Sequence, residues 1–475
     1  MRHIAHTTVQ GFSALEIVIS CAVITLALAA AASAFFGAQS LTMSADFYTN
    51  GLHRLQEVRE KYIMLEPAHF LNVVSSTLNS IVFDTYMESR AVIDITPCIK
   101  KISTTKIWNE EVNTHSVSSM IFITDPTYVK RYGESCSGPE LFPALWEDYI
   151  QSTHLFSLSN ATDIDVVNSH IFISQNSLDS TDTDIVIVDR DSMDVISELT
   201  IGSGIFALDA IRDVIFAATN STSGQFVVID VTHKNFPELV ASVSLAGVDP
   251  YGSYPQARSI FYLDDRVYIG TKETAGPEFH VFDVSNPQNP QQLGYLELTH
   301  NINDIIVRGS VAYLATSSDS EELIVVDVTN PAAMSEIGFF NTGSSLFNDR
   351  DAMSLYLLGN NLFLGRKRGT ITNNELYMID VTNPNTPTFI ASLHLIFPGT
   401  SAYVSSVQAS GDLIFVSVAD SNKSFFVVDI SNLQNIHVLD HETVVADISA
   451  FDLAYGEVYG IDPLGMVHVF KSALP

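Results

Sequence analysis

The chain has 475 residues, of which 46% are hydrophobic and 16% are charged. This balance excludes a disordered protein and leaves room for two or three domains with a large core. Acidic residues outnumber basic residues by 54 to 23, and the net charge is −31. A surface this acidic repels nucleic acid and anionic membranes, so we expect no nucleic-acid partner and a module that faces solvent.

The N-terminal part contains an apolar stretch from Phe12 to Gly37 with one charged residue, Glu16. As a helix, about 26 residues at a rise of 1.5 Å would measure about 39 Å, which is enough to span a bilayer. A carboxylate at the bilayer centre costs about 2.5–3.5 kcal/mol, so Glu16 is expected to have a function and a partner.

Gly11, Phe12 and Glu16, in this order and spacing, resemble the class III signal of type IV pilins and pseudopilins. The resemblance implies that residues 1–11 are a leader removed after Gly11 by a prepilin peptidase, and that Phe12 is N-methylated. It implies that the helix enters the inner membrane and then packs against other pilin subunits in a filament. In that family Glu16 would pair with the free amino terminus of a neighbouring subunit. The precursor would lie in the cytoplasmic membrane, and the mature protein at the cell surface or in an extracellular filament.

Other interpretations of the N-terminus stay open, since the leader lacks the Lys or Arg that usually precedes the glycine. A secretory signal cleaved near residues 32–34 is one, although Glu16 inside the apolar stretch argues against it. A lipoprotein signal ending at Cys21 is another, although hardly any apolar residues precede it. A plain membrane anchor is the third.

The helix is expected to run over residues 12–66, with a transmembrane first half and an amphipathic second half. Leu52, Leu55, Val58 and Tyr62 recur at helical spacing, and Pro67 ends the pattern.

Residues 67–150 are expected to form a small α+β domain such as pilins carry behind the stem. Residues 70–87 have partial helical periodicity, and residues 102–108 and 117–124 resemble short strands. Cys98 and Cys136 predict a disulfide, because no metal motif accompanies them and the chain is exported on the pilin interpretation. Free thiols are the alternative.

From residue 151 to residue 475 the chain contains an internal repeat. Its clearest line is an apolar quartet followed by Asp, at residues 185–189, 226–230, 279–283, 323–327, 376–380 and 425–429. A seventh, degenerate copy at 467–470 has Lys471 in the Asp position. Strand-like runs flank each quartet, and four strands per unit of about 40–50 residues make one propeller blade. The region resembles the LVIVD-repeat propellers. The resemblance implies an all-β seven-bladed propeller behind the α+β pilin-like stem.

The last repeat ends too early to supply its own outer strand. We expect residues 154–157 to provide that strand and to close the ring, which leaves no free edge. The repeated acids are Asp189, Asp230, Asp283, Asp327, Asp380 and Asp429. Because each ends a strand before a tight turn, its carboxylate is predicted to accept from backbone N–H groups one to three residues on, as a structural residue rather than a catalytic or metal-binding one.

The chain has no phosphate loop, zinc spacing or nucleophile elbow, so no enzyme and no metal site is predicted. Asp179, Asp182 and Asp184 lie in an acidic loop that could hold Ca²⁺, with a solvated loop as the alternative. Arg366 to Arg368 form the one basic cluster of the repeat region, as an exposed loop or as a contact for an acidic partner.

These patterns favour a minor or tip pilin-like subunit that displays a propeller for adhesion to, or recognition of, an unknown extracellular ligand. The alternatives are a pseudopilin of a type II secretion-like machine that engages cargo, and a membrane-anchored propeller protein or enzyme.

Overall fold

The computed structural model describes the backbone of four N-terminal strands and most of the chain from Trp146 to Ser472. The segments of the latter part that it leaves out are residues 147–148, 157, 178, 212, 248–255, 344–350, 368–373, 396–402, 420–424, 434, 443–446 and 455. The chain divides into two compact units, and each is described by itself.

The first unit contains a four-stranded sheet in the order β1-β2-β3-β4. Its strands are β1 (Ser76–Val82), β2 (Met87–Thr96), β3 (Ile99–Glu110) and β4 (Asn113–Thr124). The strands predicted at 102–108 and 117–124 lie within β3 and β4. The helical interpretation of residues 70–87 is wrong over β1, which pairs antiparallel with β2. Its apolar residues Leu78, Ile81 and Val82 stand at helical spacing, but Thr77, Ile81 and Val82 are β-branched, which favours a strand.

Several predictions concern residues outside this description: the stem helix over 12–66, the processing residues Gly11 and Phe12, Glu16, and the pair Cys98 and Cys136. Among the described residues, none of the elements is a helix long and apolar enough to cross a membrane.

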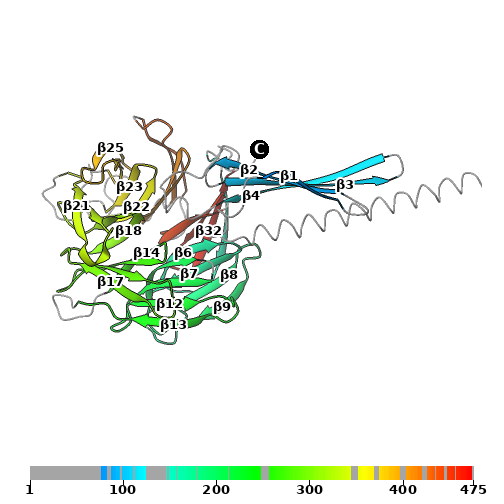
Figure 1. Cartoon of the computed structure of the whole chain (residues 1–475). Coiled ribbons are helices and arrows are strands. Elements are labelled where there is room, and N and C mark those ends of the chain that lie inside the picture. Colours follow the sequence, from blue (N-terminus) through cyan, green and yellow to red (C-terminus); the bar gives the residue numbers. More distant parts are fainter. Residues whose placement is uncertain are drawn as a thin grey trace, which may run out of the picture. The chain divides into compact units, whose positions relative to one another are not determined.

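The second unit is a seven-bladed β-propeller (Figure 1). Each blade is a four-stranded antiparallel sheet whose strands follow one another in sequence, except that the seventh has the order β30-β31-β32-β5. The predicted seven-bladed architecture is therefore confirmed.

The innermost strands contact one another in a closed ring. They are β6 (Ala161–Val167), β10 (Ile205–Ile211), β14 (Ala257–Leu263), β18 (Ile302–Arg308), β22 (Ala352–Leu358), β26 (Tyr403–Ser410) and β30 (Ala450–Ala454). The second strands are β7 (His170–Gln175), β11 (Val214–Thr219), β15 (Arg266–Thr271), β19 (Val311–Thr316), β23 (Asn361–Arg366), β27 (Leu413–Ala419) and β31 (Glu457–Ile461).

The apolar quartets form the third strands of six blades. The third strands are β8 (Ile185–Asp189), β12 (Phe226–Asp230), β16 (Phe279–Asp283), β20 (Leu323–Asp327), β24 (Leu376–Asp380), β28 (Phe425–Asp429) and β32 (Met466–Ser472). The outer strands are β9 (Val195–Leu199), β13 (Glu238–Val243), β17 (Gln291–Leu296), β21 (Ser335–Phe340), β25 (Thr388–Leu393), β29 (His437–Glu442) and, for the last blade, β5 (Tyr149–Leu155). One short 3-10 helix, η1 (Pro331–Ala333), precedes β21.

The quartets are apolar, apart from His280, because the third strands are covered on both faces. All four quartet residues of β8, β12, β16, β20, β24 and β28 are buried, whereas residues of the outer strands are largely half-buried or exposed. The buried side chains form seven hydrophobic clusters, each shared by two adjacent blades. A strand buried on both faces has no polar alternation, which is the pattern that the repeat displays.

The ring is closed by a strand from the front of the propeller, as the sequence predicts. β5 pairs antiparallel with β32 from Tyr149 opposite Ser472 to Leu155 opposite Met466. The strand begins five residues before the predicted segment 154–157. In Figure 1 the first blade, with β6 to β8, and the last, with β32, lie side by side, and β30 contacts β6.

The segment before β5 also belongs to the propeller. The side chain of Trp146 is 1% exposed and packs edge-on against Phe415, with the ring centroids 4.7 Å apart. The ring of Tyr149 lies edge-on to Phe425 and Phe470. These aromatic residues fill the interface between the sixth and seventh blades.

Candidate functional site

The inner strands carry a row of polar side chains that bond to the next strand around the ring. Equivalent positions in their inner strands are occupied by Asp165, Asp209, Gln408 and Asp452. Each of these side chains accepts a hydrogen bond from a backbone N–H in the inner strand of the following blade, from the residue that lies one position further along that strand. The donor–acceptor distances are 2.7–2.9 Å. We call these contacts, with those of the next paragraph, the inner latches.

Other inner latches lie nearer the beginning of the inner strands. Asp163 and Asp304 accept the N–H groups of Leu208 and Leu355 at 2.9 and 2.7 Å. A hydroxyl or amide group also donates to a backbone carbonyl at or near the start of the next inner strand, from Thr162, Ser259, Asn303, Ser354, Ser405 and Ser449. Every one of the seven blade junctions therefore has at least one inner latch.

The inner latches place carboxylates in a desolvated environment. Burial raises the pKa of the Asp163 carboxyl group to about 7. The hydrogen bonds from the backbone N–H groups of Leu208 and Ile164 favour the charged form and only partly offset this rise in the pKa. Burial likewise raises the pKa of Asp304 to about 7. The charge of Asp304 also acts on Asp163, although the two residues belong to the fourth and first blades. The inner ring is thus a set of carboxylates that already hold backbone donors, which is a structural arrangement.

The repeated Asp residues form the turns after the third strands. Asp230, Asp283, Asp327, Asp380 and Asp429 each accept the N–H two residues on, at 2.7–2.9 Å. Asp189 accepts the N–H groups of Asp191 and Ser192. Hydrogen bonds from the hydroxyl group and then from the backbone N–H of the Ser or Thr two residues on lower the pKa of the first five carboxyl groups, and the backbone N–H of Ser192 lowers the pKa of Asp189. This is the geometry of an Asx-type turn.

A second row of polar residues has no counterpart among the sequence predictions. The residue directly before the quartet is Asp184, Gln225, Glu278, Glu322 and Glu375 in the first five blades, and none of these is more than 1% exposed. Each side chain accepts backbone N–H groups from the segment after the outer strand of its own blade. The signal for this row was present in the sequence, as an acid or amide directly before five quartets.

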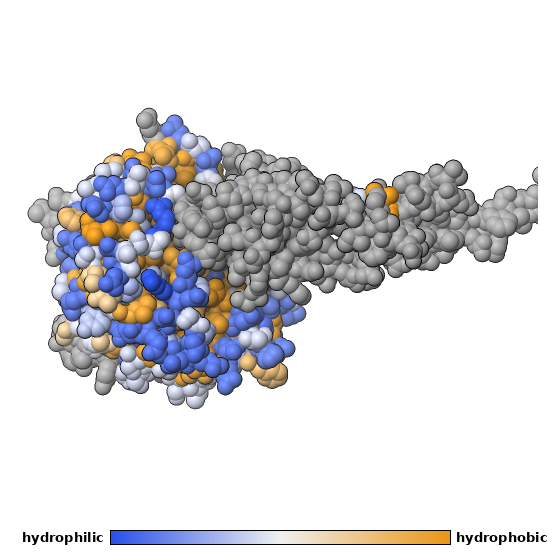
Figure 2. Space-filling model, in the orientation of Figure 1, coloured by the Kyte–Doolittle hydropathy of each residue, from blue (hydrophilic) through white to orange (hydrophobic). Residues whose placement is uncertain are grey.

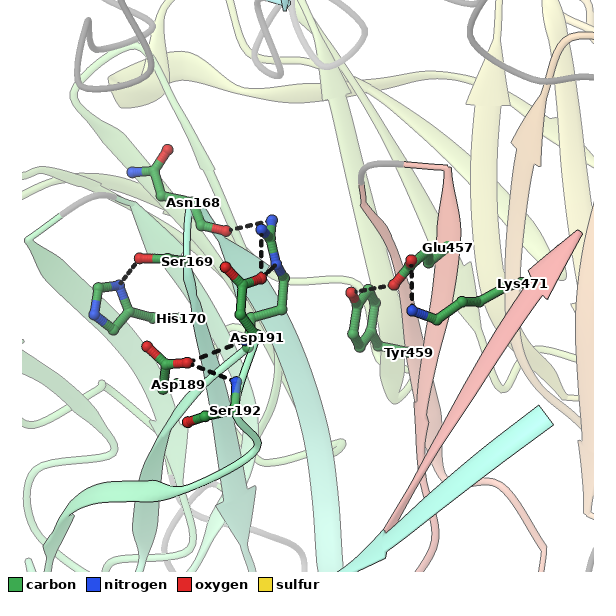
Figure 3. Close-up of polar contacts among 10 residues, drawn as sticks. Asn168, Ser169, His170, Asp189, Asp191, Ser192, Glu457, Tyr459 and Lys471 are labelled. Atoms are coloured by element: carbon green, nitrogen blue, oxygen red, sulfur yellow. Dashed lines mark hydrogen bonds and ion pairs between the residues drawn. The ribbon is translucent and has the colours of Figure 1, made fainter. Parts of the chain in front are cut away.

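Two separate groups of polar contacts, one on the first blade and one on the last, lie at the seam between these blades (Figure 3). In the first blade Arg190 bonds to the Asp191 carboxylate and to the Asn168 carbonyl. In the last blade Glu457 accepts the Tyr459 hydroxyl at 2.6 Å and pairs with Lys471 at 2.8 Å. Burial and Glu457 raise the pKa of Tyr459, whereas the charge of Arg190 acts in the opposite direction across the seam.

The acidic loop does not gather its carboxylates around one point. Asp179 accepts from the N–H and hydroxyl of Thr181, Asp182 accepts the Ser177 hydroxyl, and Asp184 accepts the N–H groups of Ile201 and Gly202. Within the described part of the chain, no group of three or more His, Cys, Asp or Glu side chains is arranged to hold a metal ion. The three carboxylates therefore hold different donors, each within its own turn or segment.

The basic cluster is not a uniform exposed loop. Arg366 is fully buried, donates to the Asn374 carbonyl and the Thr342 hydroxyl, and lies 4.9 Å from the centroid of the Tyr377 ring. The interpretation of Arg366 as an exposed contact is wrong, because its guanidinium is buried and packs inside its own blade. Arg368 lies outside the described residues.

The outer strands of the propeller carry exposed side chains. Hydrophilic and hydrophobic residues are interspersed on the face of the propeller shown in Figure 2. Large apolar side chains are exposed on the outer strands of five successive blades, at Val195, Leu239, Tyr295, Phe339 and Phe389. Exposed aromatic residues beside polar groups are typical of recognition surfaces.

Comparison with known families agrees with the repeat pattern. A model of the LVIVD repeat matches residues 301–342, 349–394 and 401–438, which comprise the fourth and fifth blades and most of the sixth. The propeller contains LVIVD repeats. The first three blades have the same strand order, and the second and third also have the same Asp turn after the third strand, whereas the turn after Asp189 in the first blade is shorter. No curated protein matches the chain.

Solved structures with some likeness come from proteins of different kinds. The computationally designed Ika8 protein is 14% identical, with a TM-score of 0.47 over 84% of this chain and 97% of that one. BamB from Moraxella catarrhalis is 15% identical, with a TM-score of 0.43 over 66% of this chain and 83% of that one. A chain of the Mitotic Checkpoint Complex is 10% identical, with a TM-score of 0.47 over 67% and 88%. At these TM-scores the likenesses carry no argument about function.

Proposed function

We propose that the chain is a pilin-like subunit that displays an LVIVD propeller on a type IV pilus or related filament, for adhesion or recognition. The observation that carries the proposal is the sequence around Gly11, Phe12 and Glu16, followed by an apolar stretch to Gly37 and, later, by a closed propeller. Its partners are other pilin subunits along the helix, a prepilin peptidase, the inner membrane before assembly, and an extracellular ligand of the propeller.

A recognition role is supported over catalysis by how the propeller uses its polar groups. The carboxylates of the inner strands that form inner latches hold backbone N–H groups of the next blade, and the repeated Asp residues hold turns. General acid–base catalysis needs a group that is free to exchange a proton with a substrate. The exposed aromatic residues of the outer strands are free to make contacts instead.

A minor or tip position follows from size. Packed helices lie about 8–10 Å apart, whereas a propeller of about 320 residues is about 50 Å wide from its expected radius of gyration. Propellers on all neighbouring subunits would crowd one another, unless the first unit holds them far from the filament axis. A sparse or terminal subunit avoids this crowding.

The test is the mature N-terminus and its assembly. Mass spectrometry of the surface-exposed protein should find a chain that begins with N-methylated Phe12. The Glu16→Ala variant should insert into the membrane but be lost from filaments, because it lacks the partner for the amino terminus of a neighbour. Ser13→Ala is the control and should assemble normally.

An unprocessed N-terminus, or normal filament entry of Glu16→Ala, would remove the pilin role. Co-purification with secretion components and the absence of surface filaments would support the pseudopilin alternative. Propellers at every subunit along the filament shaft would overturn the tip position.

A further inference from the structure

The inner strand of the third blade carries a charged side chain that the ring does not use for its own closure. Arg258 of β14 is the extra residue of a β-bulge, because the pairing with β15 shifts register between Ala257 and Ser259. A bulge leaves its extra residue outside the ladder and changes the direction of its side chain. The same bulge occurs in the inner strands of the first six blades, so the bulge residues can be compared from blade to blade.

In other blades the bulge residue makes an inner latch. Thr162, Asn303 and Ser405 each donate to a backbone carbonyl at or near the start of the next inner strand. In the third blade Ser259, one residue further on, makes the corresponding bond to the fourth blade. Arg258 is therefore not needed to hold the third and fourth blades together.

The Arg258 guanidinium has no hydrogen-bond or ion-pair partner in the part of the chain that the structure describes. Its Nε atom is buried without a hydrogen bond, and none of the ion pairs found there includes Arg258. The residue is half-buried, so it is not enclosed in the core. Burial lowers the pKa of Arg258, because a charge withdrawn from water lacks a counter-ion of its own. An arginine stays charged even so, and a site of this kind favours an anion.

The guanidinium belongs to the end of the ring at which the inner strands begin. The charge of Asp351 opposes the effect of burial on the pKa of Arg258. Asp351 directly precedes β22 of the fifth blade, whereas Arg258 lies near the start of β14 of the third blade. Since the fourth blade separates these strands on the ring, the interaction passes over the end of the ring. Arg258 thus lies at the mouth of the central channel that the blades of a propeller surround.

No carboxylate stands at the level of Arg258 in the ring. The corresponding residues of the other six blades are Thr162, Phe206, Asn303, Met353, Ser405 and Ser449. None of these side chains is charged, so the positive charge of Arg258 is the one ionised group at this level. The half-buried Phe206 and Met353 add apolar surface.

We propose that the Arg258 guanidinium binds the carboxylate of a small organic acid at this end of the channel. A guanidinium can hold a carboxylate through two parallel N–H···O bonds, which makes the contact strong and directional. The apolar side chains at the same level suit the carbon skeleton of such an acid. The inference deepens the proposed recognition function, on which it rests, by naming a class of ligand for the propeller.

The charge of the whole protein favours a ligand with a single carboxylate. A net charge of −31 repels acidic polymers. At physiological salt the repulsion between exposed charges is screened beyond about 8 Å, whereas a direct contact with the guanidinium is not. A small monoanion therefore gains the contact with Arg258 and avoids most of the repulsion.

The experiment uses the full chain in detergent micelles and two probes of similar shape, 4-fluorobenzoate and neutral 4-fluorobenzamide, titrated by fluorine NMR. The unmodified protein should bind the benzoate about fivefold or more tightly than the benzamide. Arg258→Gln should abolish this preference. Arg266→Gln is the matched control, because it removes the same charge from the other end of the β14–β15 hairpin. It should change benzoate binding by less than about twofold.

Further measurements separate binding from a structural role. Arg258→Gln should melt at the same temperature as the unmodified protein or higher, since it removes a charge that has no partner. Arg258→Lys keeps the charge without the two parallel donors, and should retain a weaker preference for the benzoate. Polyglutamate should displace the benzoate less well than acetate does at an equal concentration of carboxylate groups.

Equal binding of the two probes by the unmodified protein would overturn the proposal. Equal losses in Arg258→Gln and Arg266→Gln would reject the site, because net charge alone would then explain the binding. A lower melting temperature of Arg258→Gln would also reject it, since the guanidinium would then have a structural partner. Displacement by polyglutamate as strong as that by acetate would contradict the restriction to small acids. Failure of the pilin role is read from the processing of Phe12 and the filament entry of Glu16→Ala, so the two failures can be told apart.

Discussion

The first prediction concerns Trp146, which lies ahead of the closing strand β5. Its side chain is almost fully buried in the aromatic cluster between the sixth and seventh blades. Replacement of a buried Trp by Ala typically costs about 3–5 kcal/mol, from the lost burial and from the cavity that remains. At about 2 °C for each kcal/mol in a large domain, Trp146→Ala should lower the melting temperature of the propeller by about 6–10 °C.

Leu155→Ala is the matched control, because Leu155 lies at the end of β5 and is 69% exposed. A surface substitution of this kind usually changes stability by less than about 0.5 kcal/mol. Calorimetry of the full chain measures both variants, and the transition of the propeller is followed separately from that of the first unit. Equal melting temperatures for the two variants would refute the reasoning, because the segment before β5 would then not be part of the propeller core.

Four further predictions use other features. Glu278→Ala should lower the free energy of unfolding in urea by about 3 kcal/mol or more, because the N–H groups of Thr274, Leu298 and Thr299 lose their acceptor. The control variant Asp283→Ala, in an exposed turn, should cost clearly less. A larger loss for Asp283→Ala than for Glu278→Ala would contradict the burial argument. Gly338→Ala should cost about 1–3 kcal/mol because its Cβ would meet the Pro384 carbonyl, and an unchanged unfolding midpoint would speak against this close approach. The pKa values of Asp163 and Asp304 are raised to about 7, so the free energy of unfolding should fall as the pH rises from about 4 to 7, because the native state retains protons that the unfolded state has released. In the double variant Asp163→Asn/Asp304→Asn the free energy of unfolding should depend less on pH. The same pH dependence in the variant and the unmodified protein would contradict the raised pKa values. Cys98 and Cys136 should be recovered as one linked peptide from the non-reduced exported protein, which two free thiols would disprove.

The propeller could be predicted because its signal is repeated and apolar. A strand buried on both faces admits few polar residues, and within the six quartets His280 is the one exception, so the quartets stand out against their surroundings. The closing strand could also be predicted, since a last blade without an outer strand leaves an edge that the chain must cover. Its bounds could not, because the packing of Trp146 and Tyr149 depends on Phe415, Phe425 and Phe470, which are distant in sequence.

The polar interior was harder to predict for the same physical reason. The inner latches join side chains of one blade to backbone groups of the next, and no local pattern identifies such a pairing. Arg366 looked exposed beside Lys367 and Arg368, but the Tyr377 ring and the Thr342 hydroxyl that hold it come from outside the cluster. The sequence does not predict β1 as a strand, because Leu78, Ile81 and Val82 stand at helical spacing, and the pairing with β2 decides the structure instead.

The closure of the ring has a consequence for synthesis and export. Gln151 and His468, whose side chains bond at 2.9 Å across the β5–β32 pair, are separated by 317 positions in the chain. A chain that emerges from its N-terminus makes β5 first and must then keep it unpaired until β32 appears. During that interval a strand edge is open to other chains, and forming so distant a contact is slow. We expect nascent propellers that lack the last residues to be captured by chaperones or to aggregate, and full-length propellers to be released only after the final strand has left the ribosome or the translocation channel.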